Sequence, residues 1–225
     1  FDRFLFFRKS YIRSLFSIYD LEELVNFDQI WINIKVKKFL ENYLNKNLDI
    51  LEYGSGSSSF FFSKRVNQVT SIEHDKDYYE KVSSLNKQLN SDINFYLVEP
   101  ENDDMEKVFI SRKSIKYKNI SFKKYVLFPL NLKKKYDIIF IDGRCREKCL
   151  IIAISLLKDN GVIIFDDTEK KRTRYQKYID VFSKFADVSR YYGLNICLPY
   201  MSETSIIKNI NFEEIKKTEL YKEVM

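Results

Sequence analysis

Two glycines separated by one residue, Gly54 and Gly56, lie directly behind the apolar and acidic segment LDILEY. The chain has only five glycines, so two at one place indicate that the backbone there approaches something closely. A strand that runs through G-x-G into a helix brings backbone N–H groups against a bound ligand, and a side chain at either position would block that approach. The stretch LEYGSGSSSFFF therefore predicts a ligand-binding turn between a strand and a helix.

The pattern differs from a dinucleotide site. A dinucleotide fingerprint reads G-x-G-x-x-G, whereas the third glycine position is Ser59 in this chain. An acid, Glu52, stands two residues before Gly54, and a second acid, Glu73, ends the next apolar segment. Glu73 follows the glycines by about 20 residues, which is the separation that a strand–helix–strand unit imposes. Both acids are therefore expected close to the same ligand.

These features resemble motif I of the class I S-adenosylmethionine-dependent methyltransferases, E/D-x-G-x-G, with the acid that follows it. EYGSGSSSFFFSKRV, SIEHD and IDGRCREKC are also similar to a bacterial subgroup with E-x-G-S-G-x-S and I-D-G-R-x-R signatures. The resemblance implies that the cofactor is S-adenosylmethionine, that Glu52 and the loop backbone face its ammonium group, and that Glu73 binds the ribose hydroxyls. His74 would lie beside the adenosine, or would be an ordinary, partly exposed residue after a strand. The cofactor-binding set that the resemblance implies is Glu52, Tyr53, Gly54, Ser55, Gly56, Ser57, Ser58, Glu73, His74, Asp142 and Gly143.

Acids also end two later apolar segments, YDIIFID and GVIIFDD. Ligands bind outside the carboxyl ends of the strands in open α/β sheets, so Asp142, Asp166 and Arg144 are expected there as catalytic residues. The resemblance implies that Asp142 projects towards the methyl group. Methyl transfer from a sulfonium is a direct displacement, for which the protein aligns the acceptor and removes a proton. The candidate bases are Asp142, Asp166, Asp167 and the lysines of the stretch 170–174.

Metal dependence is left open by the same carboxylates. Three acids at these two strand ends occur in Mg-dependent O-methyltransferases, so Asp142, Asp166 and Asp167 are the metal ligands if the chain uses magnesium. Arg144 and Arg146 follow Asp142, however, and a guanidinium there could neutralise these carboxylates and displace a metal. Arg144 could instead bind a carboxylate or phosphate of the substrate, or pair internally with Asp166 or Asp167.

The function that this combination predicts is O-methylation of a small polar acceptor, such as a sugar or a glycan precursor. Nucleic-acid N-methylases usually carry a D/N-P-P-Y/F/W tetrad that stacks a flipped base, and the corresponding position reads IDGR here. A nucleic-acid methylase and a methyltransferase-like scaffold without catalysis are the alternatives.

The elements that must position these residues alternate along the chain. Five short apolar segments, LDILEY, VTSIEH, INFYLV, YDIIFID and GVIIFDD, read as strands. Between them, 57–66, 76–89 and 146–157 read as helices, and strands that are apolar on both faces indicate a covered parallel sheet. The predicted fold is α/β: a Rossmann-like doubly wound, mostly parallel seven-stranded sheet with helices on both faces. Residues 186–192 and 204–208 are expected to close it as an antiparallel pair.

The predicted domain organisation has three parts. Residues 1–46 form an N-terminal helical extension with a helix over 27–44, residues 47–208 form the cofactor-binding domain, and 209–225 form a charged tail that frays. A long insertion, 100–135, contains FKKYVLFPL, which is expected as a short helix or loop near the site.

Composition narrows the partners. The net charge is +6, but the lysines are scattered along the chain rather than gathered with aromatic residues, which argues against nucleic acid as a partner. No apolar run approaches the roughly 20 residues of a membrane-spanning helix, and the start of the chain shows no signal-peptide cleavage site. Three cysteines with one histidine, His74, make no zinc set and predict buried thiols of a cytoplasmic protein. The basic, aromatic residues 1–19 could associate weakly with a membrane surface, pack on their own domain, or dock a second copy in a homodimer.

Overall fold

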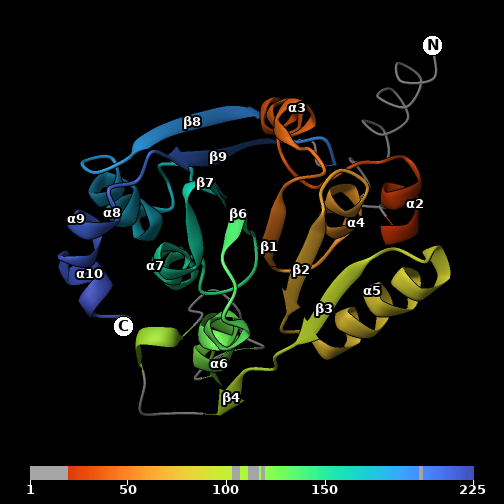
Figure 1. Ribbon diagram of the computed structural model, residues 1–225, viewed down its shortest axis with the longest axis horizontal. Helices are drawn as coiled ribbons and strands as arrows, with labels where there is room; N and C mark the ends of the chain where they lie inside the picture. The colour runs from red at the N-terminus through yellow and green to blue at the C-terminus, as the bar shows by residue number, and fades with distance from the viewer. Residues whose placement is uncertain (1–19, 103–106, 111–116, 118–119, 198–199) are drawn as a thin grey trace.

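The computed structural model describes residues 20–102, 107–110, 117, 120–197 and 200–225. The predicted membrane-associating segment 1–19 and parts of the 100–135 insertion lie outside these residues. Seven strands form one sheet in the order β3-β2-β1-β6-β7-β9-β8 (Figure 1). The strands of this sheet are β1 (Asp49–Tyr53), β2 (Gln68–Glu73), β3 (Ile93–Leu97), β6 (Tyr136–Ile141), β7 (Leu157–Asp166), β8 (Asp187–Leu194) and β9 (Met201–Lys208).

The pairing confirms the predicted fold class. The strands β3, β2, β1, β6 and β7 are all parallel, and β9 joins β7 and β8 in antiparallel pairs. The chain fills the sheet outward from β1, first through β2 to β3 and then from β6 on the other side, so the topological switch point lies between β1 and β6. Ligands of open α/β sheets bind at that point, beyond the carboxyl ends of the strands.

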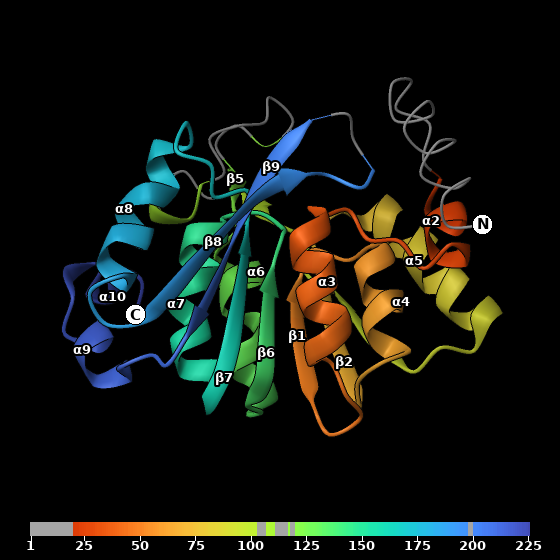
Figure 2. The ribbon, with the colours of Figure 1, turned by 90° about the horizontal axis from the view of Figure 1, so that it is seen from above.

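Helices cover both faces of the sheet, as Figures 1 and 2 show. One face carries α2 (Leu21–Asn26), α3 (Ile34–Tyr43), α4 (Ser57–Ser63) and α5 (Lys76–Leu89). The other carries α6 (Lys123–Leu127), α7 (Arg146–Leu156), α8 (Thr173–Phe182), α9 (Phe212–Lys216) and α10 (Glu219–Lys222). A small separate pair, β4 (Glu101–Asn102) with β5 (Ile120–Ser121), lies in the insertion.

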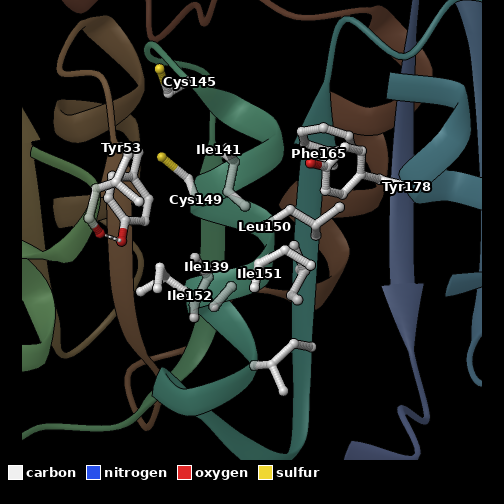
Figure 3. Packing of buried hydrophobic residues seen from close by; sticks show 14 of the residues in the cluster. Tyr53, Ile139, Ile141, Cys145, Cys149, Leu150, Ile151, Ile152, Phe165 and Tyr178 are labelled. Carbon is white, nitrogen blue, oxygen red and sulfur yellow. Dashed lines mark hydrogen bonds between the residues drawn. The ribbon is translucent and has the colours of Figure 1, made fainter. Parts of the chain in front are cut away.

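Alternation along the strands explains why they are apolar throughout. In β6, Ile139 and Ile141 pack into the core on the α7 side, while Ile138 and Phe140 pack into the core on the α4 side. Successive side chains of a strand point to opposite faces, so a strand between two helical layers needs apolar residues at every position. Figure 3 shows the first of these cores, in which α7 packs beside β6 and β7. Almost every residue of α7 is buried.

The α4 helix owes its position to three consecutive phenylalanines. Phe60, Phe61 and Phe62 are all buried, and the ring of Phe62 meets that of Phe140 edge-on with centroids 5.4 Å apart. Burying one such side chain contributes about 1.5–3 kcal/mol. The FFF run therefore holds the helix that begins at the glycine loop firmly against the sheet.

The predicted helix over 27–44 is wrong in its first part. The helix α3 begins only at Ile34, because the Asn33 side chain accepts the N–H of Val36 at 3.1 Å and caps it. Before it, Ile30 and Ile32 are fully buried while Trp31 between them is 46% exposed. The chain bends at Trp31 and Ile32, where the Ile32 N–H donates to the Ile30 carbonyl at 2.9 Å, so this stretch is not helical.

The prediction that the tail frays is also wrong. Residues 209–225 contain α9 and α10, whose Ile215, Leu220 and Val224 join the core on the α7 side. The charged residues that suggested fraying lie outside and pair along the helices, as in Lys216 with Glu213.

Two further expectations concern the insertion and the sulfur atoms. FKKYVLFPL forms α6 and a following 3₁₀ turn, Phe128–Leu132, and Tyr125 from it reaches the turn after β6, as predicted. The thiols of Cys145, Cys149 and Cys197 are free and buried. Among the described helices, none has the length and apolar character needed to cross a bilayer.

Candidate functional site

A cavity of about 960 Å³ lies beyond the carboxyl ends of β1, β2, β6 and β7. Most residues predicted for the site line it. These are Gly54, Ser55, Gly56, Ser57, Ser58, Glu73, His74, Asp142, Gly143, Arg144, Asp166 and Asp167. The structure thus gathers residues from four separate turns around one space, as the strand-end argument requires. The side chains of Glu52 and Tyr53 do not line it.

The two glycines of the loop have different structural reasons. Gly54 has φ +92°, and a Cβ there would lie 2.8 Å from both the Cα and the N of Gly143. Gly56 has φ 174°, an extended conformation, and a Cβ there would meet only ordinary contacts, the nearest being the Tyr78 hydroxyl at 3.6 Å. Gly54 therefore permits contact between the turns after β1 and β6, whereas Gly56 keeps space open in the cavity.

Glu73, at the end of β2, fastens the glycine loop. Its carboxylate accepts the N–H of Ser55 at 3.0 Å, of His74 at 2.7 Å and of Asp75 at 2.9 Å. Burial would raise the pKa of Glu73, but hydrogen bonds and the charge of the neighbouring His74 lower it on balance. The group is therefore an ionised acceptor that faces the cavity at neutral pH.

His74 lines the cavity within a group of aromatic rings. Its Nδ1 lies 2.8 Å from Glu73 Oε1. The rings of Tyr117, Phe122 and Tyr125 stand 5.5–5.6 Å from the imidazole, centroid to centroid. Tyr117 lines the cavity as well, so the imidazole and this ring form part of one aromatic wall.

Glu52 lies behind the loop. It is fully buried and accepts hydrogen bonds from the hydroxyls of Ser58, Ser59 and Ser71. Burial raises the pKa of Glu52 to about 7, although the three serine hydrogen bonds oppose the shift. In this position Glu52 acts as the anchor of the serine run.

Tyr53 is also fully buried, and its hydroxyl donates to the carbonyl of Val126 at 2.8 Å.

Sequence reasoning missed Ser59 and Ser71 as partners of Glu52. The signal for Ser71 was the parallel register that pairs it with Glu52, which single-segment patterns do not contain.

Three carboxylates meet at the other side of the cavity, around the guanidinium of Arg146. Its Nη2 lies 2.6 Å from Asp142 Oδ1, and its Nη1 lies 3.0 Å from Asp167 Oδ2 and 3.6 Å from Asp166 Oδ2. Its Nε donates to the carbonyl of Gly143 at 3.0 Å. The arginine that neutralises the acids is therefore Arg146, in the first turn of α7.

Arg144 has different surroundings. Its guanidinium stands over the ring of Tyr117, 5.4 Å from the centroid. Within the residues that the structure describes, it forms no ion pair, so the internal pairing with Asp166 or Asp167 considered from the sequence is not observed. Arg172 occupies that role at the outer edge, with Nη2 2.9 Å from Asp167 Oδ1.

Two of the acids around Arg146, the partly exposed Asp142 and the buried Asp166, have shifted pKa values. Burial raises the pKa of Asp142 to about 6; Arg146 lowers it, while Asp167 raises it further. The pKa of Asp166 is raised well above its usual range, first by burial and then by the charge of Asp142, against the opposing effect of Arg146. Asp166 also accepts the Thr204 hydroxyl. Two carboxyl groups that lie this close affect each other's protonation, so Asp142 and Asp166 titrate as a pair.

The residues at this point do not fit a metal ion. Within the described ranges, no group of three or more His, Cys, Asp or Glu side chains is arranged to hold one. The oxygens of Asp142 and Asp167 that would bind magnesium already contact the Arg146 guanidinium. Magnesium binds oxygen at about 2.0–2.1 Å in near-octahedral geometry, and the guanidinium fills that space.

Several cavity residues were not found from the sequence. Trp31, Tyr78, Tyr117, Asn195 and Tyr200 all line it. They come from five separate segments, and their side chains carry no spacing signature that links them to the glycine loop. Only folding brings them together.

The comparisons with known proteins agree on the architecture. No protein-family model matches the chain, and no curated protein matches it. An O-methyltransferase from Bacillus cereus, solved in complex with SAH, superposes with a TM-score of 0.57 at 14% identity over 85% of this chain and 92% of that one. A protein from Streptococcus mutans described as a methyltransferase, also in complex with SAH, gives 0.54 at 14% identity over 80% and 99%.

An rRNA methylase from Streptococcus thermophilus gives 0.54 at 11% identity over 79% of this chain and 95% of that one. At such identities the likeness concerns the fold, and the acceptors named for these proteins differ. The chain therefore has the Rossmann-like α/β fold of the class I methyltransferases.

Proposed function

We propose that this chain is an S-adenosylmethionine-dependent methyltransferase that acts on an oxygen of a small polar acceptor. The observation that carries the proposal is the convergence of Glu73, the open Gly56 turn and Asp142 on one cavity of about 960 Å³ at the switch point of the sheet. Two structures with the same fold are solved in complex with SAH, the product form of this cofactor.

The residues present fit the cofactor. Glu73 is an ionised acceptor whose Oε2, with one N–H bound, is suited to the ribose hydroxyls, and His74 with Tyr117 forms an aromatic wall suited to a purine ring. Gly56 leaves the loop backbone accessible. In this proposal Glu52 acts from behind, because its hydrogen bonds to Ser58 and Ser59 hold the loop in shape. When bound, the cofactor supplies an electrophilic methyl group on a sulfonium.

On the acceptor side, Asp142 takes the proton that a hydroxyl must lose when it accepts a methyl group. A pKa of about 6 makes its carboxylate a stronger base than an ordinary aspartate, yet leaves it mostly ionised at neutral pH. A hydrogen bond with the Asp166 side chain lowers the pKa of Asp142 and so moderates this basicity. Arg144, Trp31 and Tyr200 complete the cavity wall and supply a cation and two aromatic faces for a polar acceptor.

Magnesium has no step in this proposal, because Arg146 occupies the space between the acids. Oxygen as the methylated atom is supported by the carboxylate base and by the fold likeness to an O-methyltransferase. The likeness to an rRNA methylase keeps RNA among the acceptors to be tested.

A calorimetric titration with SAH tests the cofactor assignment directly. We expect one site per chain with micromolar affinity. No heat at millimolar SAH would reject the proposal and leave a methyltransferase-like scaffold. Transfer of radiolabelled methyl from S-adenosylmethionine to separated small-molecule and RNA fractions of a cell extract then identifies the acceptor class. Label in the RNA fraction alone would contradict the small polar acceptor.

A further inference from the structure

The guanidinium of Arg146 lies between the carboxyl groups that follow β6 and β7. The Arg146 side chain is 14% exposed, and its Nη1 and Nη2 lie beside three carboxyl groups at the strand ends. Its Nε donates a hydrogen bond to the Gly143 carbonyl. Three carboxyl groups, with oxygens at 2.6, 3.0 and 3.6 Å, surround the guanidinium on one side. Asp142, Asp166 and Asp167 supply the carboxyl oxygens that hard divalent cations prefer, but in the described part of the chain they surround the guanidinium and are not arranged to hold an ion.

We propose that Arg146 is a built-in replacement for a divalent cation: it holds a permanent positive charge among the strand-end carboxyl groups and keeps metal ions out of this cavity. The exclusion of metal follows from the contacts themselves. That methyl transfer proceeds without a metal rests, in addition, on the proposed function.

The geometry supports replacement rather than coexistence. An ion bound to Asp142 Oδ1 and Asp167 Oδ2 at about 2.1 Å would lie within the volume of the guanidinium that contacts both oxygens. It would also meet a fixed positive charge at close range. A guanidinium is always charged and presents several N–H donors in one plane, so a single side chain can form ion pairs with carboxylates from two strands.

The backbone around the site is shaped for this arrangement. Cys145 adopts a left-handed conformation, φ +47°, and α7 begins immediately after it with Arg146. Asp167 is also left-handed, φ +64°, so that it turns back beside Asp166 towards the same guanidinium. The remaining partners, Thr204 on Asp166 and Arg172 on Asp167, hold the acids from outside and would stay in place without Arg146.

Removing the guanidinium should therefore uncover a metal site. The experiment measures Mn²⁺ binding by electron paramagnetic resonance, with the full chain as wild type and as Arg146→Ala. We expect no Mn²⁺ bound to the wild type at this site up to about 1 mM, and at least tenfold tighter binding by Arg146→Ala. Adding Asp142→Asn to that variant should abolish the gain, which assigns the ion to the carboxylates.

Arg172→Ala is the matched control, because it removes a guanidinium that also contacts Asp167 but leaves Arg146 in place. We expect no gain of Mn²⁺ binding in it. Should Arg146→Ala fail to fold, Arg146→Gln serves the same comparison, since its amide can still reach the Gly143 carbonyl while carrying no charge. Equal Mn²⁺ binding by wild type and the Arg146 variants, or wild-type binding that Asp142→Asn removes, would overturn the inference.

The outcome is separable from the proposed function. SAH titration of the wild type tests the cofactor alone, so Mn²⁺ binding by Arg146→Ala together with absent SAH binding would keep the inference and reject the methyltransferase assignment. If methyl transfer is established, the wild-type rate should be the same with and without an excess of EDTA. Loss of the rate in EDTA would overturn metal-free transfer.

Discussion

Gly54 and Gly143 meet backbone to backbone, and a Cβ on Gly54 would stand 2.8 Å from the Cα of Gly143. This contact joins the turns after β1 and β6, the two strands at which the chain order of the sheet reverses. Gly54 belongs to the glycine motif that suggests a cofactor site, but the packing of the protein itself requires a glycine at this position, independently of any ligand.

Replacing Gly54 with alanine should destabilise the fold. Alanine is strained at φ +92°, and its Cβ would overlap the Gly143 backbone, so the free energy of unfolding should fall by at least about 2 kcal/mol. Gly56→Ala is the control, because its extended φ of 174° accepts a side chain; it should change stability by less than about 1 kcal/mol. Urea unfolding of both variants measures the difference, and equal stabilities would contradict the packing argument.

Gly56→Val should separate binding from folding. The valine side chain would enter the cavity beside the Tyr78 hydroxyl without striking the backbone, so SAH affinity should fall at least tenfold, about 1.4 kcal/mol, at nearly unchanged stability. Calorimetry with SAH, alongside urea unfolding, checks both parts. Unchanged affinity would place the cofactor elsewhere.

Glu73→Ala should weaken SAH binding by roughly 1–3 kcal/mol, the range for hydrogen bonds to charged groups. Its carboxylate lines the cavity and also holds the N–H of Ser55, so the loss combines ligand contact and loop order. Glu80→Ala, which removes an exposed glutamate of α5, is the control. If both variants lose the same affinity, the ribose assignment is wrong.

The methyl transfer rate should rise with pH through about 6 and then level. The raised pKa of Asp142 means that the carboxyl is protonated, and unable to accept a proton, below that value. Because the protonation of Asp142 is linked to that of Asp166, the pH profile describes both carboxyl groups together. Asp142→Asn should flatten this rise and slow transfer by about 10²–10⁴-fold. A flat wild-type profile between pH 5 and 8 would exclude Asp142 as the base.

Glu52→Gln should change how stability depends on pH. The folded pKa of about 7 lies above the usual value of 4.5, so the folded chain holds this proton more tightly than the unfolded chain. The stability contributed by the proton is complete below about pH 4.5 and is lost as the pH rises through 7. The wild type should lose roughly 3 kcal/mol more than Glu52→Gln across that window. Parallel curves of unfolding free energy for the two proteins would show that Glu52 titrates normally.

Much of the fold followed from local pattern. Apolar runs at strand length, such as YDIIFID, and helical stretches such as 76–89 predicted the parallel core and its helices, and the residues at strand ends predicted which side chains would share a cavity. Pattern failed at 27–33 and at the tail. In the first case Asn33 contacts Tyr191 and Thr204 from the far end of the chain, and in the second Ile215 and Leu220 find a core that their own segment does not contain.

The sequence by itself determined which residue types stand at the strand ends, because strand and helix periods depend on neighbours a few positions apart. Only the tertiary structure decided their roles. It directs the guanidinium of Arg146, rather than that of Arg144, towards the acids, and it buries Glu52 against Ser71 of the adjacent strand. Charge pairing and desolvation depend on distances in space between segments remote in the chain, and those distances exist only once the sheet has formed.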